Sequence, residues 1–393
     1  MDDVVLLGAC RTPLGKYLGS LRGVTAVELG TIAAREAIAR AGLQAADVDE
    51  IVMGHVLQAG TGQNPARQVA LRAGCPPTVA ATTVNKVCGS SLEAIIQAAR
   101  AIRVGDARVV VAGGMESMSN APHLAPRLRQ GLRIGDGALL DHMLLDGLVD
   151  ASTKLHMGNT GEIVAERHHV TRDDADRFAL RSHQRAQQAS EQGWFKDEIV
   201  PVEVDLPSGE RAMLSRDEGV RLDTSLEKLA RLRPVFQEGG VVTAGNASQL
   251  SDGGAAMVVM AAGEAKRRGL KPLGVLRATS TAGVKPEWVM EAPIPGVRGV
   301  LERAQLRIED IGLVEHNEAY ATASVAVQRA LGVPDERFNV HGGAVALGHP
   351  LGASGARVLT TLLYAMQRLR KDRGVATLCL GGGNAVQAVV ERA

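Results

Sequence analysis

A pattern that occurs near both ends of the chain limits the folds that this sequence can adopt. Segments 41–54 and 304–315 each read as a helix end, a turn and a short apolar strand, and a segment with helical periodicity precedes each. Further along, a helical segment leads into a strand at 90–114 and again at 354–383. The sequence therefore predicts two halves with a similar order of strands and helices.

The strands of both halves are almost wholly apolar and are flanked by helices, as expected for sheets that are buried on both faces of an α/β fold. We expect the first half to comprise residues 1–118 and 247–270, and the second half to comprise 271–393. Residues 119–246 have a different character, with a Leu-, Pro- and Gly-punctuated stretch and a charged helix over 171–190. We interpret them as an insertion that lies over the active site and shapes a substrate channel.

Composition excludes several classes of function. The formal charge is +1 and only 2% of the 393 residues are aromatic, so neither electrostatics nor base stacking favours a nucleic-acid partner. No apolar run approaches the ~20 residues that span a bilayer, so we expect no membrane association. The four cysteines are irregularly spaced and do not suggest a disulfide framework, which favours a reducing, cytoplasmic location.

Two cysteines stand in glycine-rich contexts and form a candidate acyl-transfer site. Cys88 precedes Gly-Ser-Ser and a helix, so we expect backbone amides and the helix dipole to lower its thiol pKa. Cys379 ends an apolar strand and is followed by three glycines, which allow close approach of a ligand. One thiol can carry an acyl group while the other moves a proton. Cys10 and Cys75 lack such a context and are interpreted as core residues.

His349 is the histidine whose surroundings suggest a fixed catalytic base. It lies in the segment Leu-Gly-His-Pro-Leu-Gly, where Pro350 restricts the backbone and the glycines allow a tight loop. The other histidines considered are interpreted as core or surface residues: His55, His142, His168, His169 and His183. His168 and His169 are adjacent, so on a helix they point apart and make a poor metal pair, and we expect no metal site.

Several ordered blocks resemble the signature segments of the thiolase family. They are Asn-x-x-Cys-Gly-Ser (85–90), Gly-Gly-Met-Glu-Ser-Met-Ser (113–119), Asn-Glu-Ala-Tyr (317–320), the stretch 339–350, and Cys-x-Gly-Gly-Gly (379–383). The resemblance continues through the insertion and covers essentially the whole chain. It implies a thiolase-like fold with two βαβαβαββ halves stacked as α-β-α-β-α layers and an inserted loop domain.

The resemblance implies a role for each matching residue. Cys88 would accept an acetyl group from acetyl-CoA while His349 takes its proton, and Cys379 would be the acid/base for a second acetyl-CoA. Asn317 would hold a water that, with His349, forms one oxyanion hole. The amides of Cys88 and Gly381 would form the other.

The resemblance also implies that coenzyme A thioesters are substrates and that no cofactor is needed. CoA contacts would come from Leu148, Arg221, Ala244 and Ser248, with His156 and Met157 beside the pantetheine and acyl end. The expected partners are acetyl-CoA, 3-ketoacyl-CoA and further copies of the chain in a dimer or tetramer.

Some residues depart from the usual family pattern. Tyr320 stands where Phe is commoner and adds a hydroxyl near the acyl pocket. Asn384 and Ala385 follow the three glycines where Gly-Gly-Gly-x-Gly is usual, which could tighten or redirect the strand. His316 precedes Asn317 and either tunes the pocket or faces away from it.

The segment 146–158 resembles the acetoacetyl-CoA branch of the family, which favours an acetyl-CoA C-acetyltransferase. The stretch 248–253 also resembles degradative members, so a 3-ketoacyl-CoA thiolase of β-oxidation is the alternative. A decarboxylating ketosynthase would carry a second His in place of Cys379. A non-catalytic lipid-carrier relative would lack Cys88 or His349.

Overall fold

The computed structural model describes residues 3–205 and 209–393, so residues 1–2 of the expected first half and 206–208 of the expected insertion lie outside it. In the described chain, ten strands form one sheet in the order β12-β13-β14-β11-β1-β10-β5-β3-β4, with β2 beside β10. The strands are β1 (Val4–Arg11), β2 (Gly15–Lys16), β3 (Glu50–Gly54), β4 (Ala80–Val84), β5 (Val109–Ser117), β10 (Ser251–Ala261), β11 (Gly274–Gly283), β12 (Leu313–His316), β13 (Arg373–Leu380) and β14 (Asn384–Arg392).

The sheet order repeats itself around the contact between β1 and β11. On one side, β1, β10 and β5 pair antiparallel and β5, β3 and β4 pair parallel. On the other side, β11, β14 and β13 pair antiparallel and β13 pairs parallel with β12. Val314 of β12 also forms a parallel bridge with Phe338. Phe338 thus takes the position beside β12 that β4 takes beside β3 in the first half. The expected α/β fold of two similar halves is confirmed.

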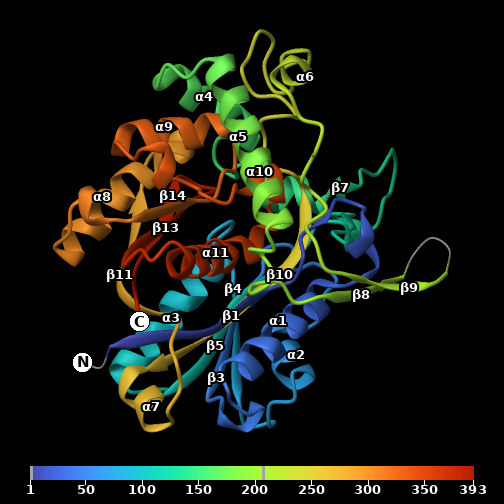
Figure 1. Cartoon of the computed structure of the whole chain (residues 1–393). Coiled ribbons are helices and arrows are strands. Elements are labelled where there is room, and N and C mark those ends of the chain that lie inside the picture. The colour runs from blue at the N-terminus through green and yellow to red at the C-terminus, as the bar shows by residue number, and fades with distance from the viewer. Residues whose placement is uncertain (1–2, 206–208) are drawn as a thin grey trace.

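Helices cover both faces of each half-sheet (Figure 1). They are α1 (Ala26–Arg40), α2 (Pro65–Arg72), α3 (Ser90–Val104), α4 (Met157–Arg167), α5 (Arg172–Glu191), α6 (Leu226–Ala230), α7 (Ala262–Arg267), α8 (Pro293–Ala304), α9 (Ala321–Leu331), α10 (Ala344–Leu347) and α11 (Ser354–Arg368). The apolar face of α1 packs with α2 on the first half-sheet, and α8 and α9 pack on the second. These outer helices leave α3 and α11 between the two half-sheets.

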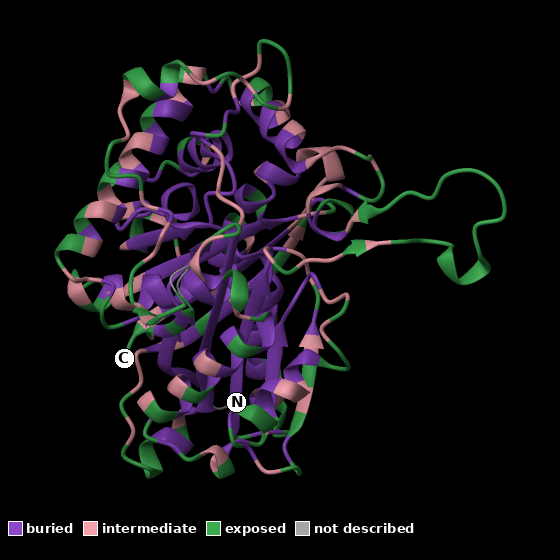
Figure 2. Ribbon diagram, turned by 90° about the vertical axis from the view of Figure 1, so that its right-hand side faces the viewer, coloured by how far each residue is buried: buried purple, intermediate pink, exposed green. Residues whose placement is uncertain are grey.

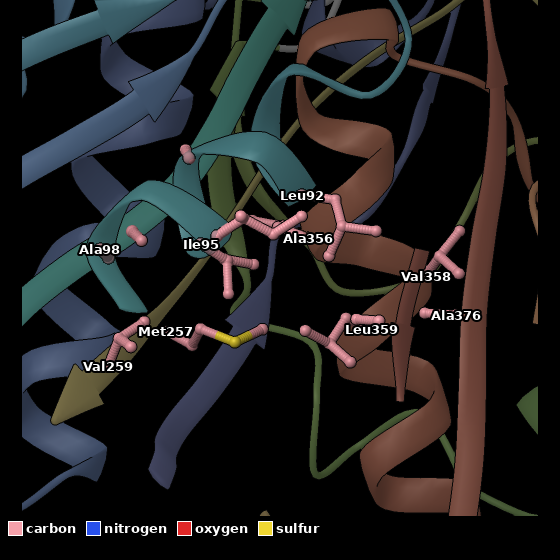
Figure 3. Close-up of a cluster of buried hydrophobic side chains, with 14 of the residues drawn as sticks. Leu92, Ile95, Ala98, Met257, Val259, Ala356, Val358, Leu359 and Ala376 are labelled. Atoms are coloured by element: carbon pink, nitrogen blue, oxygen red, sulfur yellow. The ribbon is translucent and has the colours of Figure 1, made fainter. Parts of the chain in front are cut away.

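The central layer is the contact between α3 and α11. Their buried side chains form one cluster with residues of β10 and β13, as Figure 3 shows for Leu92, Ile95, Ala356 and Leu359. At the start of the two helices, the backbone N–H of Ala356 donates to the Ser91 hydroxyl over 2.9 Å. Because Cys88 and His349 lie just before these two helices, this contact brings their loops to the same place.

Residues 119–246 add smaller elements to this core. They contain α4, α5, α6 and two short hairpins: β6 (His123–Leu124) with β7 (Leu140–Asp141), and β8 (Val202–Asp205) with β9 (Arg211–Leu214). The predicted helix over 171–190 is confirmed as α5, and Thr171 and Asp174 form a reciprocal capping box at its start. The stretch from β6 to β7 projects from the body as exposed ribbon (Figure 2).

Among the described residues, no helix combines the length and the apolar character needed to cross a membrane. The exposed residues instead cover the outer helices and the connecting loops, while both half-sheets and the central helices are buried (Figure 2).

The central layer predicts a large stability cost for shortening a side chain there. Leu359→Ala removes a fully buried side chain between the half-sheets and should lower the free energy of unfolding by about 2–5 kcal/mol. Leu369→Ala, at the exposed end of the same helix, should change it by less than about 1 kcal/mol. Calorimetric unfolding of the two variants tests this, and similar losses in both would contradict a packed central layer.

Candidate functional site

One cavity collects the residues on which the sequence analysis concentrated. Cys88, His349, Cys379 and Gly381 line it, and the other lining residues are Gly147, Leu148, Met157, Ser248, Val289, Met290, Ala319, Tyr320, Leu351 and Leu380. Its volume is about 40 Å³. A cavity needs roughly 10–15 Å³ on this measure to hold one water, so the space suits a very small group.

Cys88 is presented by a strained turn. Val87 has a φ of 48°, a left-handed conformation that is unfavourable for a β-branched residue. Two side chains hold it there: Asn85 Oδ1 accepts from the Val87 N–H over 3.0 Å, and the Ser90 hydroxyl donates to the Val87 carbonyl over 2.6 Å. These contacts explain the Asn-x-x-Cys-Gly-Ser block, because its polar residues fix the turn that carries the thiol.

Gly89 allows this turn to approach the second thiol. A Cβ at Gly89 would collide with the side chains of Leu380 and Val386, next to Cys379. The three glycines 381–383 close the hairpin between β13 and β14, and Gly382 and Gly383 have φ near +80°. Asn384 and Ala385 continue that hairpin in register, paired with Leu380 and Cys379, so they do not redirect the strand.

The expectation of a lowered Cys88 pKa is wrong for this structure. Burial raises the pKa of the Cys88 thiol to about 12, and the amides of Gly381 and of Cys88 itself, which hydrogen-bond the sulfur, only partly oppose it. Cys88 is buried in an apolar cluster, so the cost of desolvating a thiolate exceeds the stabilisation from the amides and the helix end. Burial also raises the pKa of Cys379 to about 12, and both residues are thiols in this state.

His349 is neutral, and one of its nitrogens is free to accept a proton. Burial, with a smaller effect of the Arg357 charge, lowers the pKa of His349 to about 3. The Ser354 hydroxyl lies 2.5 Å from Nδ1 and donates to the Pro350 carbonyl over 2.8 Å. Because its only proton is used there, the hydroxyl accepts from Nδ1–H, which leaves Nε2 unprotonated.

Asn317 lies against this imidazole. Its Nδ2 is 3.3 Å from Nδ1 and 3.2 Å from Nε2 of His349, so the amide group lies against the ring. Its Oδ1 is buried and has no hydrogen-bond partner among the described residues. A buried carbonyl oxygen without a partner is a site where a water molecule is expected to bind.

An aromatic chain runs beside the cavity. The ring of His156 stacks on Phe236 at 4.8 Å, and Phe236 meets the Tyr320 ring edge-on at 6.2 Å. Tyr320 and Met157 line the cavity, whereas His156 caps α4, where its Nδ1 accepts from the Gly158 N–H over 2.9 Å. Burial raises the pKa of the Tyr320 hydroxyl, so it remains protonated.

The residues expected to contact CoA divide into two groups. Leu148 and Ser248 line the cavity. Arg221 and Ala244 are exposed and lie outside its lining; the Arg221 N–H donates to His183 over 3.1 Å. The structure therefore brings part of the expected set to the thiols and leaves the rest on the surface of the segment 119–246.

The remaining histidines have structural surroundings. His316 is fully buried against Phe338, bonded to Ser324, and faces away from the cavity. The other partners are Glu116 for His55, Asp146 for His142, Glu291 for His168 and the Arg221 amide for His183, while His169 is exposed. No group of three or more potential ligands in the described chain could hold a metal ion.

Several contributors were missed by reasoning from the sequence. Ser354, which fixes the His349 tautomer, begins the predicted helical segment at 354 and was given no role. Met290, whose sulfur lies 3.7 Å from Cys379 Sγ, comes from a segment that carries no motif. The spacing of five residues between His349 and a Ser before a helix is the one signal that could have indicated Ser354.

Comparison with known proteins gives the same family over the whole chain. Residues 4–263 match the model of the thiolase N-terminal domain, and residues 270–392 match that of the thiolase C-terminal domain. The chain is 49% identical to the acetyl-CoA acetyltransferase of Pseudomonas aeruginosa and 47% identical to that of Cupriavidus necator, each over 100% of both proteins.

Solved structures agree with this. The acetyl-CoA acetyltransferase of Bacillus anthracis superimposes with a TM-score of 0.98 at 40% identity, covering 100% of this chain and 99% of that one. Human mitochondrial 3-ketoacyl-CoA thiolase gives a TM-score of 0.97 at 37% identity with the same coverage.

Burial of His316 predicts a pH-dependent contribution to stability. Its pKa is lowered from 6.5 to about 3, so below pH 6.5 the unfolded chain binds a proton that the folded chain does not. This opposes folding by up to about 1.4 kcal/mol per pH unit as the pH falls from 6.5 towards 3.

His316→Asn keeps a hydrogen-bond acceptor and removes the titration. The stability difference between this variant and the unaltered protein should therefore be constant above pH 7 and shift in favour of the variant below pH 6. A difference independent of pH would contradict a neutral His316.

Proposed function

Because the chain belongs to the thiolase family, we propose that it catalyses the reversible Claisen condensation of two acetyl-CoA molecules to acetoacetyl-CoA and CoA. The chain is an acyltransferase by family, and many of its relatives carry the name acetyl-CoA acetyltransferase. The observation that carries the proposal is the single small cavity lined by two thiols, a neutral imidazole and the Gly381 turn.

In the first half-reaction, Cys88 takes the acetyl group. Cys88 and His349 are both neutral in the free enzyme, so the proton moves to His349 Nε2 as the sulfur attacks the thioester carbon. The amides of Gly381 and Cys88 point to the sulfur and are placed to receive the oxyanion of the tetrahedral intermediate. When the carbon–sulfur bond to CoA breaks, His349 returns the proton to the CoA sulfur.

In the second half-reaction, the Cys379 thiol first gives its proton to water, and the thiolate then removes a Cα proton from another acetyl-CoA. Acetylation makes Cys88 a neutral thioester, so no Cys88 thiolate is present to raise the Cys379 pKa further. The enolate oxygen would accept a hydrogen bond from a water held on the unpaired Oδ1 of Asn317, beside His349. The enolate carbon then attacks the acetyl group on Cys88, and the Cys88 sulfur leaves as a thiolate while acetoacetyl-CoA forms. The proton on Cys379 passes to this thiolate, and Cys379 takes back a proton from water.

The substrates supply the CoA moiety, and no resident cofactor or metal is part of this scheme. Leu148, Ser248, Arg221 and Ala244 would contact CoA along the segment 119–246, which we assign as the loop domain that forms the channel. The domain halves remain 1–118 with 247–270 and 271–393. Met157 and His156, through Phe236, would bound the acyl end.

The size of the cavity favours short acyl groups. A volume of about 40 Å³ leaves room for an acetyl-sized group, and Met157, Met290 and Tyr320 close the rest. The alternative, a 3-ketoacyl-CoA thiolase with a longer chain range, is favoured by the likeness to the human mitochondrial enzyme of that name.

Assembly into a homo-oligomer, a dimer or tetramer, is supported by two features of the surface. The projecting stretch between β6 and β7 exposes Leu128, Leu132, Ile134 and Leu139, with Ile134 fully exposed. The strand β4 ends the sheet order with a free edge of sequence Ala-Ala-Thr-Thr-Val, which carries no charge. Four free thiols support a cytoplasmic location.

Separate substitutions distinguish the two thiols. Incubation with acetyl-CoA followed by acid quench and mass spectrometry should find one acetyl group on the Cys88 peptide, and none in Cys88→Ala. In Cys379→Ser the acetyl group should still form, while condensation falls by roughly 100- to 10,000-fold because the proton transfer is impaired. Acetyl on Cys379, or equal loss of labelling and turnover in Cys379→Ser, would reverse the assignment.

Chain-length dependence tests the substrate range. Each extra methylene in a packed cavity costs about 1–3 kcal/mol, so the two that 3-ketohexanoyl-CoA adds to acetoacetyl-CoA should lower kcat/KM by roughly 30-fold or more. Met157→Ala and His156→Ala should flatten this fall by helping the longer substrate. A preference of the unaltered enzyme for 3-ketooctanoyl-CoA would favour the β-oxidation thiolase instead.

A further inference from the structure

A buried carboxylate lies behind the His349 loop and has no part in the scheme above. Glu116, near the end of β5, is 0% exposed. It accepts three backbone N–H groups: Gly352 over 2.8 Å, Leu57 over 3.1 Å and Val56 over 3.2 Å. Hydrogen bonds to a charged acceptor are about twice as strong as neutral ones, so this residue ties together three segments that are distant in sequence.

The contact with Gly352 involves the segment that carries His349. Gly352 lies three residues after His349 in the short turn Leu351–Ala353, and its neighbour Leu351 lines the cavity. The turn is pressed against β5: a Cβ at Gly114 would collide with the Gly352 carbonyl, and one at Gly352 would come within 2.6 Å of the Met115 carbonyl. The Gly-Gly-Met-Glu block therefore forms the surface on which this turn rests.

His349 is held from two directions. On the side of β10, its own N–H donates to the Gln249 carbonyl over 2.9 Å, and Ser354 fixes its ring. On the side of β5, Glu116 supplies the charged contact through Gly352. Without the Glu116 carboxylate, the buried Gly352 N–H would lose its acceptor and the turn would be free to move away from β5.

We propose that Glu116 is a positioning residue for His349, which it holds at Cys88 through the amide of Gly352. The proposal rests on the acyl-transfer function proposed above. Loss of the Glu116 carboxylate should displace His349, the proposed base, and should leave the CoA-binding segment in place. A carboxylate with a general structural role would affect both. A displacement of about 1 Å at a reacting group can cost roughly 100-fold in rate.

The surroundings of Glu116 distinguish three substitutions. In Glu116→Gln, the amide oxygen can occupy the place of Oε2, which accepts from Val56 and Gly352. The amide nitrogen then takes the place of Oε1, where it faces His55 Nε2 at 3.2 Å and gives up the contact with the Leu57 N–H, which needs an acceptor. Gln therefore keeps the Gly352 contact, Asp is one methylene too short to reach it, and Ala removes it.

Asp49 provides a matched control. Its carboxylate accepts the N–H groups of Arg108 and Val109 over 2.8 and 2.9 Å. These residues lie at the start of β5, whereas the His349 turn contacts the end of β5. Asp49 is exposed, whereas Glu116 is buried; Asp49→Asn removes the charge from an acceptor on the same strand without touching the turn.

The experiment is single-turnover acetylation of Cys88 by acetyl-CoA in the full chain, measured by rapid quench and mass spectrometry, with steady-state kcat and KM beside it. Labelling of the unaltered protein tests the proposed function independently of Glu116. Glu116→Ala and Glu116→Asp should slow acetylation by roughly 100-fold with little change in KM for acetyl-CoA. Glu116→Gln should stay within roughly fivefold of the unaltered rate, and Asp49→Asn should match it.

The outcomes separate the two claims. If the unaltered protein is labelled and Glu116→Asp acetylates at its rate, the positioning role is wrong and the proposed function stands. The positioning role is also wrong if Glu116→Gln is as slow as Glu116→Ala, or if Asp49→Asn is equally slow. If Glu116→Ala does not fold, the comparison of the Asp and Gln variants decides.

Discussion

The site depends on the meeting of two helix N-termini in the middle of the molecule. The Ala356 amide at the start of α11 donates to Ser91 at the start of α3, and the apolar faces of the two helices fill the space between the half-sheets. The strained turn with Cys88 directly precedes one helix, and the His349 turn precedes the other. A repeated half-fold thus places two different loops at one point, and neither half contains the site alone.

Burial sets the protonation states of the two thiols and of His349. The same burial that raises the pKa values of the two thiols to about 12 lowers the pKa of His349 to about 3. Cys88, Cys379 and His349 are therefore all neutral before substrate binds. In the proposed reaction, charge would develop only when substrate has bound, at the amides of Cys88 and Gly381 that already point to the sulfur. Such a site would stabilise the transition state without a reactive thiolate at rest.

Much of this architecture could be predicted from sequence, because the repeat, the apolar strands and the glycine-rich turns are local patterns. The helix at 171–190 with its Thr171 cap, and the two thiols and the histidine, follow from such patterns. The direction of the Cys88 pKa shift could not be predicted from the helix that follows the thiol. It is set by desolvation, which depends on the side chains from other segments that pack around the sulfur. Ser354, Met290 and Glu116 act through contacts between segments, which no local pattern shows.

The most direct test is a crystal structure of the protein cooled rapidly after a soak in acetyl-CoA. The account predicts continuous density for an acetyl group on Cys88 Sγ, with its carbonyl oxygen at the amides of Cys88 and Gly381, and a water on Asn317 Oδ1 beside His349. An acetyl group on Cys379, or an acetyl oxygen that points away from both amides, would contradict the division of roles between the two halves.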